Sequence, residues 1–521
     1  MGLPGMAAAT TAAGLAAGWC AARVPGFGPL LWVGLLVLCL ALPPAQRRLL
    51  DDRWLLAATL LLGCSWLVAC DHELAMRHSL LFVAAAFVFA LARLSGPTDR
   101  LVWALAAGLA LTAVVALHQA SGDLSATRAG VAALPRGWQG AALARISGGR
   151  AFGTSALPGH FAALLVLALP LVAERAWLTR RWERMGWVLC LALSVWAIAL
   201  TRSLAALAVG GALLLPLLLR GRSTRLAVAG AIALAALAAA ALVWRSDIAT
   251  LEPLRLRWGN WRTAAWVFAR HPWLGVGAGG VGQAALAGPT GGTNITPYAH
   301  NTPLQLLAEF GVAGLLPLTA GSAWLVRLVR RGWPAHPALA LAVASVPLHN
   351  LVDFSAYAPE VLLPWSVLAG ALAARVAPLP RRPLHSWALI ALLGCGTVLS
   401  TLAWRSESAL ADPGAGGSEP SVKSALAAAR WAPWTVTPAE IAADRALAGA
   451  CAPETLDEVE RTLAERAWVQ PLSSGWAEAR SRVLLAEGRP GEALVWAREA
   501  RRRAPWRSEL AGLEAACAPP R

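Results

Sequence analysis

The sequence predicts an all-α integral membrane protein with about 12–13 transmembrane helices and a small helical C-terminal domain. Three observations lead to this fold class. The 521 residues are 57% hydrophobic and 14% charged, whereas soluble domains carry about 25% charged residues. Apolar runs of about 20 residues, the length that crosses a bilayer, recur through residues 1–403. Beyond that point the chain becomes rich in Ala, Glu and Arg with a helical period.

The expected membrane helices are joined by short connections, apart from two long loops at 119–158 and 244–302. The spans are expected at 5–22, 28–43, 54–70, 79–94, 101–118, 159–176, 186–201, 203–219, 226–243, 303–326, 337–352, 358–376 and 385–403. The first apolar run has no basic segment before it and is followed at once by further spans. It is therefore interpreted as the first helix and not as a cleaved signal peptide.

The formal net charge of +16 does not indicate nucleic-acid binding, because the arginines do not form one patch. They occur in short clusters between apolar runs, such as Arg180, Arg181 and Arg184, and the clusters fall in alternate loops. Loops rich in Arg and Lys remain on the cytoplasmic side. The N-terminus is therefore expected inside, and both long loops and the C-terminal tail are expected in the periplasm of a bacterium with an inner membrane.

The two long loops also carry arginines, including Arg145 and Arg150 in the first and Arg257 in the second. Long loops obey the charge rule less strictly than short ones. Arginine is the side chain best suited to hold a phosphate or carboxylate through two parallel hydrogen bonds. An anionic ligand on the outer face is the interpretation that these residues favour.

The C-terminal part differs from the membrane domain in composition. Residues 404–423 are expected to be a linker, because Asp, Pro, Gly and Ser are concentrated at 412–420. Residues 424–521 are expected to form a helical tail. Within the tail, 476–505 resembles one tetratricopeptide unit, with a turn glycine, two small packing residues and a closing proline. These residues are Gly488, Ala493, Ala500 and Pro505.

Residues 424–471 are interpreted as a degenerate earlier unit of the same kind, and an ordinary helical hairpin is the alternative for both. Tetratricopeptide repeats dock partners and carry no chemistry themselves. Cys451 and Cys517 lie in this tail and can pair if it is periplasmic.

The sequence contains no metal-ligand cluster, phosphate-binding loop, Ser/His/Asp triad or dinucleotide loop, and its eight cysteines match no zinc or redox spacing. No cofactor and no metal are therefore expected. His271 and His336 stand beside prolines in loops and are interpreted as incidental.

The segment 254–314 carries the candidate site. Apolar residues recur at spacings of four, three, four and three, which is one stripe of a helix. They are Leu254, Trp258, Trp261, Ala265 and Phe268. The two tryptophans and the flanking arginines indicate a helix that lies along the outer membrane interface. It is expected to stop at Pro272. Four glycines, among them Gly275 and Gly277, follow within six residues and allow a close backbone approach to a ligand, with a plain flexible turn as the alternative.

His300 and Asn301 precede Pro303, which suits the first turn of a helix. The pair is expected at the outer end of a membrane span, and Glu309 about two turns deeper. A carboxylate at that depth must face protein or water. One histidine, one amide and one carboxylate therefore converge on the outer side. A capped helix with a structural glutamate is the alternative.

Four elements of the chain resemble the bacterial O-antigen ligase family. His300-Asn301, nine residues, Gly311, two residues and Gly314 are similar to its signature of His, then Asn, Ser or Gln, with the same spacing of small residues. The other three elements are Arg257-Trp258-Gly259-Asn260-Trp261 with Pro272 to Gly277, Arg150-Ala151-Phe152-Gly153-Thr154, and His349-Asn350-Leu351-Val352-Asp353-Phe354. The resemblance covers about 145–375.

One element departs from the family pattern. Where the family shows Ser-Arg-Gly at an outer turn between two spans, this chain has Thr201-Arg202-Ser203-Leu204, so the arginine comes two residues early. Arg202 either reaches the same ligand by another path or leaves that role to Arg145 or Arg150.

The resemblance implies a GT-C-like glycosyltransferase that moves a glycan from undecaprenyl pyrophosphate to a hydroxyl acceptor, without metal and with inversion. It implies that Arg257, followed by Arg202, Arg150 and Arg145, holds the pyrophosphate. His300 accepts the acceptor's proton, and Glu309 orients His300 or lines the acceptor path. Asn301, Gly275 and Gly277 are expected to contact substrate. The apolar lipid tail of the donor is expected between the spans.

The acceptor stays open, with three choices on the same scaffold. It is lipid A core in a ligase, the growing glycan in a polymerase, or Ser or Thr of a protein in an O-oligosaccharyltransferase. The tail favours a protein or assembly partner. A transporter or flippase is the alternative from another class, although transporters favour internal repeats and mid-membrane charges that the sequence does not show. An inactive scaffold acting through its tail is a further alternative.

Overall fold

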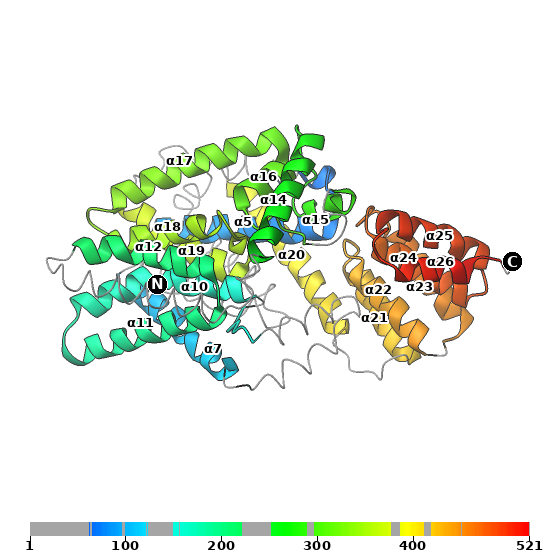
Figure 1. Ribbon diagram of the computed structural model, residues 1–521, viewed down its shortest axis with the longest axis horizontal. Helices are drawn as coiled ribbons and strands as arrows, with labels where there is room; N and C mark the ends of the chain where they lie inside the picture. The colour runs from blue at the N-terminus through cyan, green and yellow to red at the C-terminus, as the bar shows by residue number, and fades with distance from the viewer. Residues whose placement is uncertain are drawn as a thin grey trace.

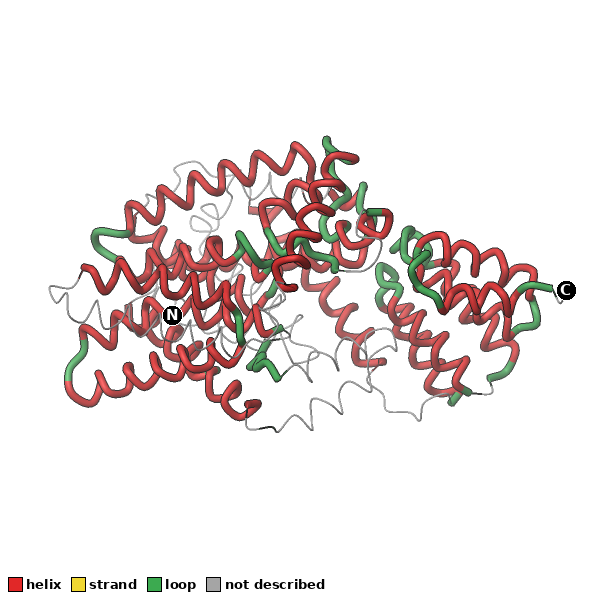
Figure 2. Tube along the Cα trace, viewed as in Figure 1, coloured by secondary structure: helices red, strands yellow, loops and turns green. Residues whose placement is uncertain are grey.

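The computed structural model describes residues 62, 65–95, 99–120, 122, 149–155, 157–220, 252–288, 296–376, 386–410, 418–449 and 451–519. Within these ranges the regular elements are helices, and no strand occurs (Figure 2). The protein is an all-α multi-pass membrane protein, as the apolar runs predict. The expected spans 5–22, 28–43 and 226–243, and most of 54–70, lie outside the described residues.

Six described helices are long and apolar enough to cross a membrane. Their spans are His72–Arg93 (in α5, His72–Ser95), Val102–Ala120 (α6, Asp99–Leu111, with α7, Ala113–Ala120), Pro158–Leu178 (α10), Arg181–Leu200 (in α11, Arg181–Thr201), Thr302–Gly332 and Pro359–Val376 (α19). Two shorter apolar helices accompany them, α12 (Leu204–Arg220) and α18 (Pro337–His349). Helix α20 (Ser386–Leu410) leads to the tail.

Two expected boundaries were wrong. Helix α5 begins at His72 and not at 79, because Asp71 accepts a hydrogen bond from the amide of Leu74 and caps the helix. The expected continuous span 303–326 is divided into α16 (Thr302–Phe310), a 3₁₀ turn η3 (Gly311–Gly314) and α17 (Leu315–Gly332). Gly311 has a φ of +61°, which ends the first helix.

Helix α10 forms the centre of the membrane domain. It packs against α6, α11, α12, α18 and α19, and 72% of its span is buried. By contrast, 22% of the α11 span and 11% of the span containing α17 are buried. The apolar side chains of α11 and α17 therefore face outward, as expected of lipid-facing helices.

The tail consists of α21 (Glu419–Trp431), α22 (Thr437–Ala448), α23 (Pro453–Glu465), α24 (Ser474–Ala486), α25 (Pro490–Arg503) and α26 (Glu509–Cys517). Successive helices pack as hairpins at one end of the molecule (Figure 1). Gly488 forms the turn between α24 and α25 with a φ of +75°, and Ala493 and Ala500 are buried. The tetratricopeptide assignment stays a prediction. Cys451 and Cys517 are unpaired.

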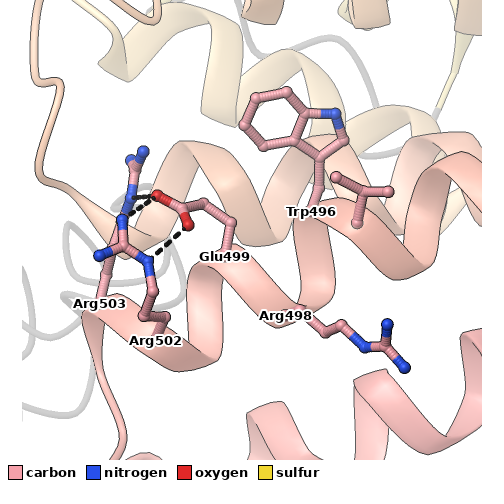
Figure 3. Close-up of a pocket in the computed structure, with 6 residues that line it drawn as sticks. Trp496, Arg498, Glu499, Arg502 and Arg503 are labelled. Carbon is pink, nitrogen blue, oxygen red and sulfur yellow. Dashed lines mark hydrogen bonds and ion pairs between the residues drawn. The ribbon is translucent and has the colours of Figure 1, made fainter.

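A pocket on the tail surface lies along α25 (Figure 3). Its lining consists of Val495, Trp496, Arg498, Glu499, Arg502 and Arg503. Glu499 accepts hydrogen bonds from Arg502 and Arg503, and Arg498 pairs with Glu514. Each arginine of this pocket therefore has a carboxylate partner, although Arg502 and Arg503 share one carboxylate.

Candidate functional site

Helix α14 (Glu252–Arg270) forms the first wall of the site, at the place where the apolar spacing predicts a helix. Its buried face includes Ala264 and Val267, each 0% exposed. Trp258, from the predicted stripe, is 60% exposed, which agrees with a helix that lies along a membrane interface. Trp261 turns inward and donates a hydrogen bond from Nε1 to the carbonyl of His300 at 3.4 Å. The helix thus fixes the backbone of the predicted catalytic histidine.

The glycine-rich loop after α14 approaches the protein's own backbone closely. A Cβ added at Gly275 would lie 2.3 Å from the Glu309 carbonyl, and one at Gly277 would lie 2.4 Å from Cα of Ala69. Both glycines have positive φ. The amide of Gly277 donates to the carbonyl of Glu309 at 2.9 Å. The glycines are thus required for the loop to reach α16, and their predicted contact with substrate stays a prediction.

His300 occupies a left-handed backbone conformation, with a φ of +53°. Such a conformation is costly for a residue other than Gly and is held only by surrounding contacts. Asn301 supplies these contacts, because its Oδ1 accepts from the amide of Leu304 at 2.9 Å and its Nδ2 donates to the carbonyl of Leu351 at 2.8 Å. Asn301 therefore caps α16 and fixes the direction of the His300 side chain, which is 28% exposed.

Asp353 lies between two histidines. Its Oδ1 is 3.7 Å from Nδ1 of His300, and its Oδ2 is 3.7 Å from Nδ1 of His349. These are ion-pair distances and are longer than hydrogen bonds. Burial would raise the pKa of Asp353, but its polar contact with His300 and its attraction to His349 and His160 outweigh burial and hold the pKa below its usual range. Asp353 is therefore an ionised carboxylate facing His300.

A second histidine–carboxylate pair stands beside the first. His160, in the first turn of α10, has its Nδ1 3.7 Å from Oε1 of Glu360 in the first turn of α19. The ring of Phe354 separates the two pairs, with its centroid 4.8 Å from that of His160 and 4.6 Å from that of His300, both edge-on. Nε2 of His160 is buried without a hydrogen-bond partner. Two imidazoles therefore face one aromatic ring.

Glu309 is fully buried and takes part in a different network. Its Oε1 accepts from the amide of Gly279 at 2.8 Å and from Nε2 of Gln305 at 2.6 Å. Its Oε2 accepts from the hydroxyl of Tyr357 at 3.0 Å. None of these described contacts of Glu309 is with His300. The carboxylate that lies close enough to orient His300 is that of Asp353. The contacts of Glu309 join the glycine loop, α16 and the segment before α19.

Arg150 and Arg202 meet at one turn, although 52 positions separate them in the sequence. Nε of Arg150 donates to the carbonyl of Thr201 at 2.9 Å. Arg202 caps α11 in a left-handed conformation, and a Cβ added at Gly149 would lie 3.9 Å from its guanidinium. The unusual position of Arg202 relative to the family pattern therefore still brings it beside Arg150. Arg145 lies outside the described residues.

This arginine turn lies on the same side of the membrane domain as the histidines. The segment 149–155 leads directly into α10, whose second residue, Gly159, faces Asp353: a Cβ added there would lie 2.8 Å from Oδ2. Arg257, on α14, is half-buried and lies one helical turn before Trp261, which donates to the carbonyl of His300. The fold therefore places Arg150, Arg202 and Arg257 on the side that carries His300 and Asp353.

Several residues of this site did not stand out in the sequence. Asp353 and His349 belong to a motif that the resemblance identified, but neither was named as a site residue. Phe354 ends the same motif and was not named either. His160 and Tyr298 carried no signal, because they lie in other segments and a single sequence does not show which segments meet. In the parts of the chain that the structure describes, no group of His, Cys, Asp and Glu side chains has the arrangement to hold a metal ion.

Comparison with known proteins shows which family this part of the chain resembles. A family model described as O-antigen ligase matches residues 187–319, which include Arg202, Arg257, His300 and Glu309. The chain is therefore O-antigen-ligase-like in this region, and the match supports a glycosyltransferase-type ligase or polymerase in a multi-pass membrane protein. No curated protein and no solved structure matches the chain.

Proposed function

We propose that this protein transfers a glycan from an undecaprenyl-pyrophosphate-linked donor to a hydroxyl acceptor on the periplasmic face of the bacterial inner membrane. The observation that carries the proposal is the pairing of His300 with ionised Asp353, at 3.7 Å, on the side of the fold where three arginines gather. A base for a hydroxyl and cations for a pyrophosphate are the two requirements of this reaction.

His300 accepts the proton of the acceptor hydroxyl. As the acceptor oxygen forms its bond to the anomeric carbon, the bond from that carbon to the pyrophosphate oxygen breaks, and the electron pair leaves with the pyrophosphate. His300 becomes an imidazolium, and the negative charge of Asp353 stabilises it. A single displacement of this kind inverts the anomeric centre and needs no metal ion, because the leaving group is already a stable anion.

The arginines hold the leaving group. Guanidinium groups pair with phosphate oxygens through two hydrogen bonds and keep their charge at any physiological pH. Arg257 is the first choice because it lies one turn before Trp261 on α14, and Trp261 contacts the backbone of His300. Arg150 and Arg202 share one turn on the same side and are suited to hold the second phosphate. The lipid tail of the donor is expected to lie between the spans.

The arrangement of arginines supports the periplasmic orientation. The site is built from the N-terminal ends of α10 and α19, whereas the opposite ends of these helices carry Arg175 and Arg375. Arg375 pairs there with Asp99, at the start of α6. Since arginine-rich ends remain in the cytoplasm, the site faces outward. The tail contacts the end of α5 that faces the glycine loop, which supports the proposal that the tail is periplasmic too.

The acceptor is not determined by these side chains. Lipid A core, a growing glycan and a protein hydroxyl present the same group to His300, so a polymerase and a protein O-oligosaccharyltransferase remain choices within the proposed chemistry. The tail favours an acceptor or partner that is a protein. The family match supports none of the alternatives from another class, whether a transporter, a flippase or a scaffold.

The proposal is tested by replacing His300 and Arg257 with Ala in separate variants. Membranes that contain radiolabelled lipid-linked glycan are used, and transfer of label out of the lipid fraction is measured. His300→Ala is expected to lose at least about 100-fold of the transfer rate, the usual contribution of a general base. Arg257→Ala is expected to lose about as much, because it removes a donor that stabilises the charge of the leaving group. His271→Ala and Arg262→Ala are matched controls, because both residues are exposed, and Arg262 lies on the same helix as Arg257. Normal transfer by both site variants would contradict the proposal.

A further inference from the structure

The tail contacts the membrane domain at the N-terminal end of α5 (Figure 1). The amide of His72 donates to the carbonyl of Val469 at 2.9 Å. Nε2 of Gln470 donates to Oδ2 of Asp71 at 3.2 Å. Asp71 is also the residue that caps α5. The first turn of this membrane helix therefore takes part of its hydrogen bonding from a segment that lies about 400 residues later in the sequence.

Glu73 makes a second set of bonds to the tail. Its Oε2 accepts from the amide of Val436 at 3.3 Å, and its Oε1 lies 3.5 Å from the hydroxyl of Thr437. The same carboxylate pairs with Arg77, one turn along α5, at 2.9 Å. Glu73 is 5% exposed, whereas the side chain of Arg77 is 63% exposed. A buried carboxylate that accepts from a tail amide is costly to leave without that partner.

Three rings close the contact. The ring centroids of Trp66 and His72 are 5.1 Å apart, those of His72 and Trp468 are 5.2 Å apart, and those of the two tryptophans are 6.4 Å apart. The pairs Trp66–His72 and Trp66–Trp468 are edge-on and the pair His72–Trp468 is tilted, arrangements in which aromatic rings attract each other beyond the burial of their surface. The contact between the tail and α5 therefore consists of hydrogen bonds together with a cluster of three aromatic rings.

The same end of α5 supports the glycine loop. A Cβ added at Gly279 would lie 2.5 Å from Cβ of Leu74 and 3.3 Å from Nδ1 of His78, so the loop lies directly on the helix. Just before α5, the amide of Cys70 donates to the carbonyl of Val276 at 3.0 Å. A displacement of the first turns of α5 would therefore displace the loop, because packed backbones at this distance leave no room for independent motion.

Two paths continue from there to the catalytic side chains. Gly279 donates its amide to Glu309, which lies on the helix that begins just after His300. His78 contacts the hydroxyl of Tyr298 at 3.1 Å. The Tyr298 ring stacks on Phe354 at 4.1 Å, and Phe354 in turn meets His300 edge-on. The tail is thus connected to His300 through α5 by direct contacts.

We propose that Glu73 is a positioning residue of the transfer site, and that the C-terminal tail holds it. By holding Glu73, the tail holds the first turns of α5 in place. These turns position the glycine loop and the stacked rings of Tyr298 and Phe354, which contact His300. The expected effect of Glu73 on the transfer rate rests on the proposed function. Its expected effect on the position of α5 and the glycine loop does not. A partner that binds the tail would therefore act on the transfer rate through this contact.

The test compares Glu73→Ala with Glu73→Gln in the full-length protein in nanodiscs. Backbone hydrogen exchange is followed at Val436, in the tail, and at 276–279, in the glycine loop. Glu73→Ala is expected to accelerate exchange at both places by at least about 10-fold, because it removes one net hydrogen bond of about 1–2 kcal/mol. Glu73→Gln keeps an acceptor oxygen and is expected to restore most of the protection. Arg77→Ala is the matched control, since it removes the ion pair and leaves the tail bonds in place.

Transfer of radiolabelled lipid-linked glycan is measured for the same variants. Glu73→Ala is expected to lower kcat about 10-fold with KM unchanged, because the tail contact is remote from the donor. Gln470→Met, on the tail side, tests the contact without altering α5 and is expected to give a smaller change of the same kind. Faster exchange at Val436 with unchanged exchange at 276–279 would overturn the proposal. If the unaltered protein transfers nothing, the proposed function fails, and the exchange data still decide whether the tail positions the loop.

Discussion

Two buried carboxylates near His300 have opposite surroundings. Both oxygens of Glu309 accept hydrogen bonds at 2.6–3.0 Å, from Gly279, Gln305 and Tyr357. Asp353 accepts one hydrogen bond, from the amide of Phe354 at 2.8 Å, and faces the imidazoles of His300 and His349 at 3.7 Å. Nε2 of His349 is buried without a partner. A carboxylate whose two oxygens both accept hydrogen bonds stabilises the fold. A charged carboxylate beside imidazoles that lack some of their hydrogen-bond partners can instead stabilise an imidazole that takes up a proton. From this difference we propose that Glu309 has a structural role and that Asp353 takes part in the chemistry.

The largest expected effect comes from Asp353→Asn. The amide keeps the size of the side chain but removes the charge that would stabilise a protonated His300, so we expect the transfer rate to fall about 1000-fold, which corresponds to about 4 kcal/mol of barrier. The rate is measured with radiolabelled lipid-linked glycan in membranes. The thermal midpoint of the purified variant is the control and is expected to fall, because the lowered pKa of Asp353 means that its charge also stabilises the fold. The two rates are therefore compared at a temperature at which both proteins are folded. A rate within threefold of the original would remove Asp353 from the mechanism.

Glu309→Ala is expected to act on stability instead. It leaves the Gly279 amide, Gln305 and the Tyr357 hydroxyl without their acceptor, and each lost partner costs about 1–3 kcal/mol. We expect a loss of about 3 kcal/mol or more, seen as a clear fall in the thermal midpoint in detergent. If the variant were as stable as the original and had lost only transfer, Glu309 would belong to the chemistry and the comparison would be reversed.

Tyr357→Phe is a milder form of the same change. It removes one of the three donors to Glu309 and leaves the ring edge-on to that of His78, with the ring centroids 4.7 Å apart. The expected loss of stability is about 1 kcal/mol, with transfer retained. Unfolding curves of the two proteins measured side by side would show it. A change in transfer without a change in stability would be inconsistent with a structural role.

A third carboxylate, Glu440 in the tail, has other carboxylates as neighbours. Burial first, and then the charges of Glu73, Asp444 and Glu478, raise its pKa to about 8. Because the folded pKa lies above the unfolded value of 4.5, its contribution to stability is complete below about pH 4.5 and is lost as pH rises through about 8.

The smallest substitution, Glu440→Gln, tests this pH dependence. The unaltered protein is expected to hold its tail less firmly at pH 8.5 than at pH 6, whereas the Gln variant is expected to show a flatter profile. Exchange protection of the Val436 amide, measured at the two values of pH, reports on the contact with Glu73. Equal pH dependence in the two proteins would assign the effect to another group.

The sequence predicted the fold class and the positions of two helices of the candidate site correctly. Apolar runs of bilayer length require helices, because the backbone has no other partner in lipid, and the spacing of α14 gave its bounds within two residues of those observed at each end. The position of α16 followed from Pro303. The end of α16 could not be predicted in this way, because the helix is interrupted at Gly311 by contacts with the glycine loop. The carbonyl of Pro272, at the start of that loop, accepts a hydrogen bond from the amide of Val312.

Residue types, periodicity and motif order thus determined by themselves that this chain is a membrane protein with a histidine and arginines near one of its faces. Only the tertiary structure decided that Asp353, and not Glu309, faces His300, that Arg202 lies beside Arg150, and that the tail contacts α5. The physical reason is that helix formation and membrane insertion depend on local composition. The partner of a buried charge, by contrast, is set by packing between segments that lie tens to hundreds of residues apart.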